Sequence, residues 1–131
     1  MSFVVELKCS RCGKKYSLEE KPIMCANKDD ARLDVVYDYE AVKNALSKEQ
    51  LSKRSGGVWK YWELLPVDPK FAVSLGEGNT PLIKAERLAE ELGLEELWLK
   101  DETRNPTASF KDRSMSVGVS KAVEFGFDTV A

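Results

Sequence analysis

The chain has 131 residues, which is long enough for one domain with a hydrophobic core. Its 20 basic and 22 acidic residues nearly cancel, so its charge gives no reason to expect a nucleic acid or an anionic membrane as a partner, and no apolar run is long enough to cross a bilayer. The chain has no histidine, which excludes Ser-His and Cys-His catalysis, and imidazole ligands for a metal, within these residues.

The N-terminal segment predicts a small β unit that carries a candidate metal site. A strand is expected over residues 3–7, and the sequence CSRCG follows it, with Cys9 and Cys12 as its two cysteines. This pattern is typical of a zinc knuckle, because the turn lets backbone N–H groups face the two sulfurs. Cys25 offers a third sulfur. The β-branched and aromatic run 33–39 predicts the strand that closes the unit.

The metal content of this unit has more than one interpretation. A zinc ribbon needs a second cysteine pair, but Lys28 occupies the position three residues after Cys25. Asp29 or Asp30 offers an oxygen ligand instead, although neither has the usual spacing. The alternative is a ribbon without metal, in which the cysteines are ordinary buried thiols. Three cysteines do not suit a secreted disulfide framework, and the first residues lack a signal-peptide pattern, so we expect a reduced, cytoplasmic protein.

Two short helices are predicted next, over residues 40–46 and 48–54. Ser47 and Gln50 form a capping-box pattern at the start of the second helix. Gly56-Gly57 is expected to end that helix.

An aromatic segment, Trp59-Lys60-Tyr61-Trp62, follows the helices. It has the composition of a stacking platform for single-stranded nucleic acid, but the surrounding charge is mixed, so packing of these rings is the favoured interpretation. Pro66 and Pro69 then bracket a linker into the last part of the chain.

The last part of the chain predicts alternating helices and strands. The loop 76–81 is glycine-rich but is not a phosphate loop, because no Gly-Lys-Ser/Thr follows it; on its pattern alone it is a tight turn that leads into a helix. We expect a helix over 85–92, a strand over 95–100, a helix over 110–125 and a strand over 128–131. Strand, helix and strand in this order predict a right-handed crossover and a parallel sheet, and therefore an α/β fold.

The segment 105–113, with the sequence NPTASFKDR, contains the candidate catalytic residue. Pro106 favours an extended backbone before it, so Ser109 is expected at a helix N-cap, with Asp112 three residues later as a variant capping box. Lys111 then becomes the second residue of the helix. Both the helix dipole and burial favour a neutral, nucleophilic amine at this position, whereas the alternative is a solvated lysine in an ordinary first turn.

This segment resembles the cofactor-lysine segment of threonine synthases, within the tryptophan-synthase-β-like enzymes (fold type II) that use pyridoxal phosphate. Three further stretches are similar to that family in the same order, namely VWKYWELLP at 58–66, SLGEGNTPL at 74–82 and LWLKDE at 97–102. With the cysteine-bearing N-terminus, the resemblance covers nearly the whole chain. It implies a fold type II α/β domain with a partial parallel sheet, preceded by a small zinc-ribbon-like β unit that departs from the four-cysteine version.

The resemblance also implies an activity and roles for individual residues. The implied reaction converts O-phosphohomoserine and water to threonine and phosphate. Lys111 would hold pyridoxal phosphate as an imine and then act as base and acid on substrate carbons. Phe110 would lie against the pyridine ring, with a core position as its alternative, and the loop 76–81 would lie near the cofactor or substrate. The candidate zinc ligands are Cys9, Cys12 and Cys25.

We expect three parts in this chain and a longer, homodimeric protein around it. The parts are the ribbon-like unit 1–39, a helical segment and linker 40–69, and the start of the catalytic domain at 70–131. In the family, a cofactor-phosphate loop and most substrate-binding groups come after this point, so the chain alone is expected to be inactive. The alternatives are a cysteate synthase or threonine dehydratase-like enzyme of the same superfamily and, outside enzymes, a zinc-ribbon binding module.

Overall fold

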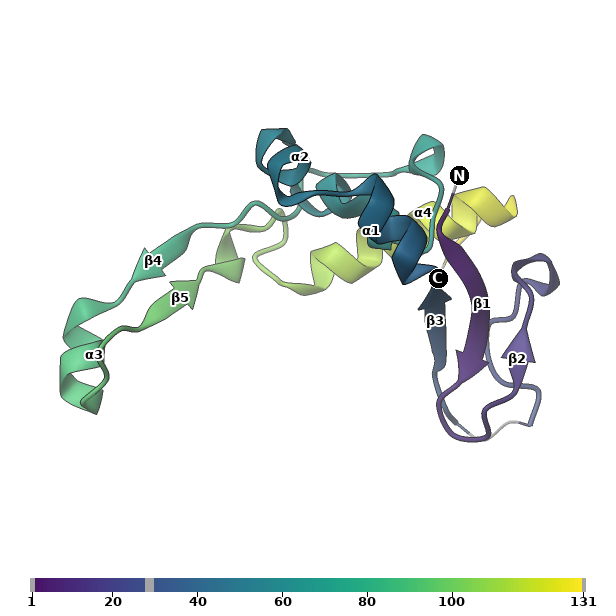
Figure 1. Ribbon diagram of the computed structural model, residues 1–131, viewed down its shortest axis with the longest axis horizontal. Helices are drawn as coiled ribbons and strands as arrows, with labels where there is room; N and C mark the ends of the chain where they lie inside the picture. Colours follow the sequence, from purple (N-terminus) through teal and green to yellow (C-terminus); the bar gives the residue numbers. More distant parts are fainter. Residues whose placement is uncertain (1, 28–29, 131) are drawn as a thin grey trace.

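The computed structural model describes residues 2–27 and 30–130, which form an extended molecule (Figure 1). A three-stranded β unit lies at one end, and a hairpin of two short strands and a helix projects at the other. The C-terminal helix and irregular segments lie between them. No helix in the described ranges is both long enough and apolar enough to span a membrane.

The N-terminal unit is an antiparallel sheet of strands β1 (Val4–Cys9), β2 (Lys15–Tyr16) and β3 (Leu33–Tyr37), in the order β2-β1-β3. In the central strand, Leu7 lies opposite Tyr16 on one side. The short 3₁₀ helix η1 (Leu18–Glu20) follows β2. Both strands predicted for this unit are confirmed, because β1 and β3 form next to each other where the sequence indicated them.

Two capped helices follow, as predicted. Helix α1 (Tyr39–Ala45) begins after Asp38, whose carboxylate accepts a hydrogen bond from the Ala41 N–H at 2.9 Å. Helix α2 (Lys48–Lys53) has the predicted capping box. The Gln50 N–H donates to the Ser47 hydroxyl at 3.1 Å, and the Ser47 N–H donates to the Gln50 side chain at 2.8 Å.

The aromatic segment lies in the 3₁₀ helix η2 (Gly57–Leu64), and two of its rings pack within the chain. The Trp62 ring lies 5.9 Å from the Phe3 ring, between centroids. The Trp59 indole N–H donates to the Ser116 hydroxyl at 2.9 Å. These contacts support the packing interpretation over an exposed platform for nucleic acid.

The projecting hairpin differs from the predicted parallel sheet. Strands β4 (Leu82–Lys84) and β5 (Trp98–Lys100) pair antiparallel, with helix α3 (Glu86–Leu92) between them in sequence. The α3 helix ends at Gly93, which has a φ of +65° and turns the chain back so that β5 returns along β4. Residues 128–130 form no strand, and no parallel pair of strands occurs in the described ranges. The prediction of a right-handed crossover and a parallel sheet is therefore wrong for these residues.

The pairing of β4 with β5 has a local origin. The two strands are close in sequence, so closing the loop between them costs less entropy than pairing β5 with the end of the chain. Strand β4 was not predicted, because three residues between Pro81 and a helix are too few to show alternation. After β5 the chain enters the 3₁₀ helix η4 (Glu102–Arg104).

Helix α4 (Lys111–Phe125) ends, as predicted, at a left-handed glycine, Gly126. One of its faces binds the backbone of residues 68–73, which include the 3₁₀ helix η3 (Pro69–Phe71). The side chains that do so are spaced four residues apart and are Ser116, Ser120 and Glu124. The Val73 N–H donates to the Ser120 hydroxyl at 2.8 Å. These bonds use the main-chain groups of residues 68–73, not their side chains, to hold that segment against α4.

Two glycines allow the backbone of residues 76–78 to contact the start of η2. The Val58 N–H donates to the Glu77 carbonyl at 3.1 Å. Gly57 has a φ of +58°, and a Cβ at that position would lie 2.0 Å from the Glu77 carbonyl oxygen. Gly78 has a φ of +92°, and its Cβ would lie 2.7 Å from the Val58 nitrogen. Neither position has room for a side chain.

A partly buried polar cluster joins this contact to α4. The Arg113 guanidinium donates two hydrogen bonds to the Glu102 carboxylate, at 2.7 and 2.8 Å. The Thr80 hydroxyl and the Asn105 amide donate to the same carboxylate, at 2.6 and 2.9 Å. The Asn105 carbonyl oxygen accepts from the Gly78 N–H at 2.9 Å. The hydrogen bonds from Arg113, Thr80 and Asn105 hold the pKa of Glu102 well below its ordinary value.

We expect Gly57→Ala to destabilise the protein more than Gly56→Ala. Both glycines have a positive φ, but a Cβ at position 56 has open space around it, whereas one at position 57 collides with a backbone carbonyl. The difference in the free energy of unfolding should be about 1–3 kcal/mol, measured by urea denaturation of the two variants. Equal losses in the two variants would contradict the close contact between residues 57 and 77.

Acid should weaken the fold through Glu102. Because the pKa of this carboxyl is depressed in the folded state, its contribution to stability is complete above the ordinary glutamate value of 4.5 and is lost as the pH falls below it. Urea unfolding between about pH 6 and pH 3 should therefore show a smaller loss for Glu102→Gln than for the parent chain. A variant that loses as much stability as the parent over this range would exclude Glu102 as a principal acid-sensitive group.

Candidate active site and cysteine cluster

Lys111 is the first residue of α4, one position earlier in the helix than predicted. Its side chain is exposed, and its Nζ lies 5.7 Å from the centroid of the Phe110 ring. The Lys111 N–H donates to the Ser109 hydroxyl at 3.2 Å. Phe110 already has helical dihedral angles, φ −63° and ψ −19°, and is 64% exposed.

The predicted capping box between Ser109 and Asp112 does not form. The Asp112 carboxylate instead accepts hydrogen bonds from the N–H of Thr107, at 2.8 Å, and from its hydroxyl. Ala108 has a φ of +56°, and this left-handed turn accounts for the change, because it folds Thr107 back over the first turn of the helix. Asp112 therefore holds the helix start, as expected from the sequence, but with a different partner.

A cavity of about 520 Å³ opens beside Lys111. Its walls come from the loop before the hairpin and from the start of α4. The lining residues are Val73, Leu75, Glu77, Thr107, Ser109, Lys111, Asp112, Met115, Ser116 and Val119. The cavity thus combines one amine, two carboxylates and three hydroxyls with an apolar wall, and Lys111 is its one cationic side chain within the described residues.

Phe110 does not line this cavity. It lines a neighbouring cavity of about 510 Å³, together with residues of β4, β5 and η4. Ser109 is shared by both cavities, so Lys111 and Phe110 lie on either side of the turn that contains it.

Two features of the site were not recognised from the sequence. Glu77 is 2% exposed and lines the cavity beside Lys111. Ser116 lies where η2, α4 and the segment at Val73 meet. The four-residue spacing of Ser116, Ser120 and Glu124 was the available signal for a polar contact along α4, whereas nothing local distinguishes Glu77 from an exposed glutamate.

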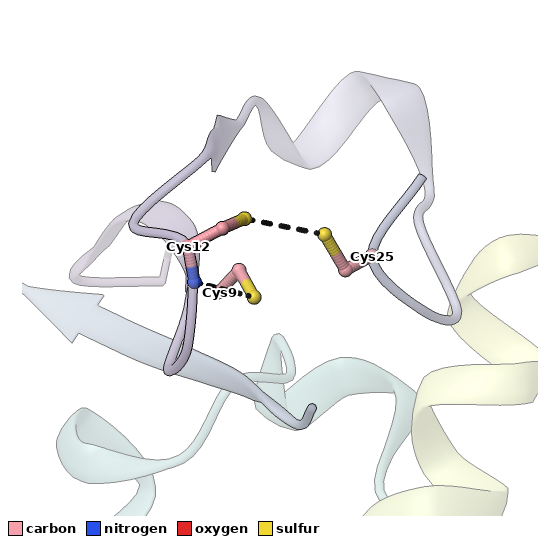
Figure 2. A group of neighbouring side chains, drawn as sticks. All are labelled: Cys9, Cys12 and Cys25. Carbon is pink, nitrogen blue, oxygen red and sulfur yellow. Dashed lines mark hydrogen bonds between the residues drawn. The ribbon is translucent and has the colours of Figure 1, made fainter. Parts of the chain in front are cut away.

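The three cysteines form a separate cluster in the N-terminal unit, where their sulfur atoms converge (Figure 2). All three sulfurs lie within 4.8 Å of one another, and those of Cys12 and Cys25 are 3.6 Å apart. Cys9 and Cys25 are buried, and Cys12 is exposed. The three candidate ligands thus lie close enough together to share one metal ion.

Hydrogen-bond donors surround the cysteine sulfurs. The Cys12 N–H lies 3.5 Å from the Cys9 sulfur, as expected for a knuckle turn. The Asn27 amide donates to the Cys12 sulfur at 3.4 Å. The Tyr16 hydroxyl donates to the Cys25 sulfur at 3.2 Å, and this bond is the main reason why the pKa of the Cys25 thiol is lowered.

Acidic ligands do not complete this cluster within the described residues. Asp30 is not among the groups whose oxygen lies near the three sulfurs. Lys28 and Asp29, which the sequence analysis also considered, lie outside the described residues.

Comparison with known proteins finds one family and several relatives that are similar to this chain. Residues 73–131 match the model of the family described as pyridoxal-phosphate dependent enzyme. The chain is 50% identical to the threonine synthase of Methanosarcina acetivorans over 125 residues, and 48% identical to that of Methanocaldococcus jannaschii over 124 residues. These alignments cover 95% and 94% of this chain but only 30% of each relative.

A plant relative is more distant. Threonine synthase 2, chloroplastic, of Arabidopsis thaliana is 36% identical over 122 residues, which cover 82% of this chain and 23% of the relative. No solved structure matches the chain. The part of the chain from residue 73 onward is similar to the pyridoxal-phosphate dependent enzymes, and this part includes all the residues that line the cavity beside Lys111. The similarity to threonine synthases extends through the cysteine unit, and the chain spans about 30% of the length of these relatives.

Proposed function

We propose that this chain is part of a threonine synthase, which converts O-phospho-L-homoserine and water to L-threonine and phosphate. The observation that carries the proposal is the 50% identity to a threonine synthase over 95% of the chain. A cysteate synthase or a threonine dehydratase-like enzyme would share the lysine segment, so an assay of the longer protein with each candidate substrate decides among them.

The residues beside Lys111 fit one end of pyridoxal phosphate. The cavity has the volume of a small-ligand site, about 300–1,000 Å³. Lys111 supplies an amine for the aldehyde of the cofactor, and Thr107 and Ser109 supply hydroxyls close to it. Met115 and Val119 offer apolar surface for a ring. When bound, the cofactor supplies an electron sink for carbanions formed on the substrate.

The residues at the start of α4 then have distinct roles in the proposed enzyme. The Lys111 Nζ would bind the cofactor and later move protons at substrate carbons. Phe110 would lie against the pyridine ring; its exposed ring, whose centroid is 5.7 Å from Nζ, supports this role, although Phe110 lines the neighbouring cavity. Asp112 and Arg113 hold the first turn of the helix, so that the amine keeps its direction.

The wider organisation is also proposed from the resemblance. We propose a cytoplasmic homodimer, with a ribbon-like unit at residues 1–39, a helical linker at 40–69 and the start of the catalytic domain from residue 70. The separate antiparallel sheet of β1, β2 and β3 supports the first unit as a compact module.

We propose a zinc site at the cysteine cluster. A tetrahedral zinc ion with Zn–S bonds of about 2.3 Å separates its sulfurs by about 3.8 Å, and the 3.6 Å between Cys12 and Cys25 is close to this value. The donors from Cys12 and Asn27 would stabilise bound thiolates. Three sulfurs leave a fourth position for water or an oxygen ligand.

We expect Lys111→Ala to abolish covalent attachment of pyridoxal phosphate in the longer protein. The parent should show a visible absorption band with the cofactor, and borohydride should fix the cofactor on a peptide that contains Lys111. The variant should lose the band and more than about 99% of its turnover. Lys43→Ala removes an exposed lysine from α1 and is the matched control, which should keep both. Cofactor fixed on another lysine of the parent would refute this assignment.

Metal binding should depend on the three cysteines. Cobalt(II) added to the metal-free, reduced chain should produce a thiolate-to-metal absorption band, and zinc should displace it with one ion per chain. Cys9→Ser or Cys25→Ser should weaken cobalt binding by about tenfold or more, because each removes a buried sulfur. A chain that shows no such band, or that binds equally well after both substitutions, would support the ribbon without metal.

A further inference from the structure

Glu77 is a buried carboxylate in the wall of the cavity that contains Lys111. Within the described residues no lysine or arginine forms an ion pair with it, and its hydrogen bonds come from neutral donors. The Ser74 hydroxyl lies 3.0 Å from both carboxylate oxygens, and the Leu75 N–H donates to one of them at 2.9 Å. Burial by itself raises the pKa of Glu77, but the hydrogen bonds to its carboxylate, which include those from Leu75 and Ser74, outweigh it and keep the pKa below its ordinary value.

The position of Glu77 connects three elements. Its carbonyl accepts from the Val58 N–H of η2, its carboxylate accepts from its own loop, and its side chain lines the same cavity as Ser116 of α4. Ser116 also accepts from the Trp59 indole and donates to the Val73 carbonyl at 2.7 Å. The loop at residues 73–77 is therefore fixed to the same helix that begins with Lys111.

We propose that Glu77 is a positioning residue of the lysine site. Its carboxylate holds the loop at residues 74–77 as the cavity wall beside Lys111, so that the cavity keeps the shape that receives the cofactor. Glu77 acts through this loop and not on the reacting atoms, because its oxygens are already occupied by donors from its own surroundings. The inference rests on the proposed function, since it assigns a role within the same site.

The chemistry of the carboxylate makes the role specific. Donors from Ser74 and Leu75 converge on two acceptor oxygens. A glutamine of the same shape keeps one neutral acceptor oxygen for the Leu75 N–H and replaces the other oxygen with an NH₂ group, to which the Ser74 hydroxyl can no longer donate. Glu77→Gln should therefore weaken the bonds that hold the loop, because it replaces a charged acceptor with a neutral one, at little change in side-chain volume.

The test compares Glu77→Gln with Glu63→Gln in the longer protein. Glu63 of η2 is also a buried glutamate, at 1% exposed, but it forms an ion pair with Arg54 and does not line the cavity. Pyridoxal phosphate affinity, the visible band, kcat and KM, and the melting temperature are measured for the parent and both variants. We expect Glu77→Gln to weaken cofactor affinity or lower kcat/KM by about tenfold or more, and Glu63→Gln to lose less than about twofold at a similar melting temperature.

Each outcome decides the proposal. The positioning role is overturned if cofactor affinity and turnover are unchanged in Glu77→Gln. It is also overturned if Glu63→Gln shows an equal loss, because the loss would then follow from lower protein stability in both variants. If Glu77→Gln does not fold, Ser74→Ala removes one donor to the same carboxylate and should show a smaller loss in the same direction. A parent protein that attaches no cofactor at Lys111 overturns the proposed function together with this role, whereas attachment in both parent and Glu77→Gln, with equal affinity, overturns this role alone.

Discussion

The two hydrogen bonds from Arg113 to Glu102 fix the direction of the first turn of α4. A guanidinium and a carboxylate that meet through two parallel bonds restrict rotation as well as distance. Arg113 follows Lys111 by two residues, so the pair restrains the backbone from which the amine extends. Thr80 and Asn105 add donors to the same carboxylate, which links the start of the helix to the loop before β4 and to the turn after η4.

The absence of side chains at two positions is as important as these bonds. The backbone of residues 76–78 reaches η2 only because Gly57 and Gly78 have no Cβ and both adopt positive φ. This contact buries Glu77 between η2 and α4, and the charged oxygen atoms of Glu77 then need donors from the surrounding chain. The close backbone contact at Gly57 and Gly78 therefore determines which polar groups surround Glu77 in the cavity wall.

Local structures that depend only on residues adjacent in sequence could be predicted. The capping box of Ser47 and Gln50 depends on four consecutive residues, and it formed as predicted. The similar pattern at Ser109 and Asp112 failed, because Thr107 reached the carboxylate through the left-handed turn at Ala108. Strand β4 and the burial of Glu77 were not predictable in this way. Both depend on partners more than ten residues away, which no local pattern reveals.

Helix α4 joins the two candidate sites of the chain, because a different part of the molecule contacts each of its ends. Its first turn is held by Glu102 and Thr107, near the lysine cavity. Near its last turn, the Lys21 amine of the N-terminal unit donates to the Phe125 carbonyl at 2.9 Å, where the negative end of the helix dipole favours a cation. The Phe3 ring of the same unit lies against Trp62. Two contacts of different chemistry therefore cross the predicted boundary at residue 39, so the orientation of the cysteine unit and that of the helix that begins with Lys111 restrain each other.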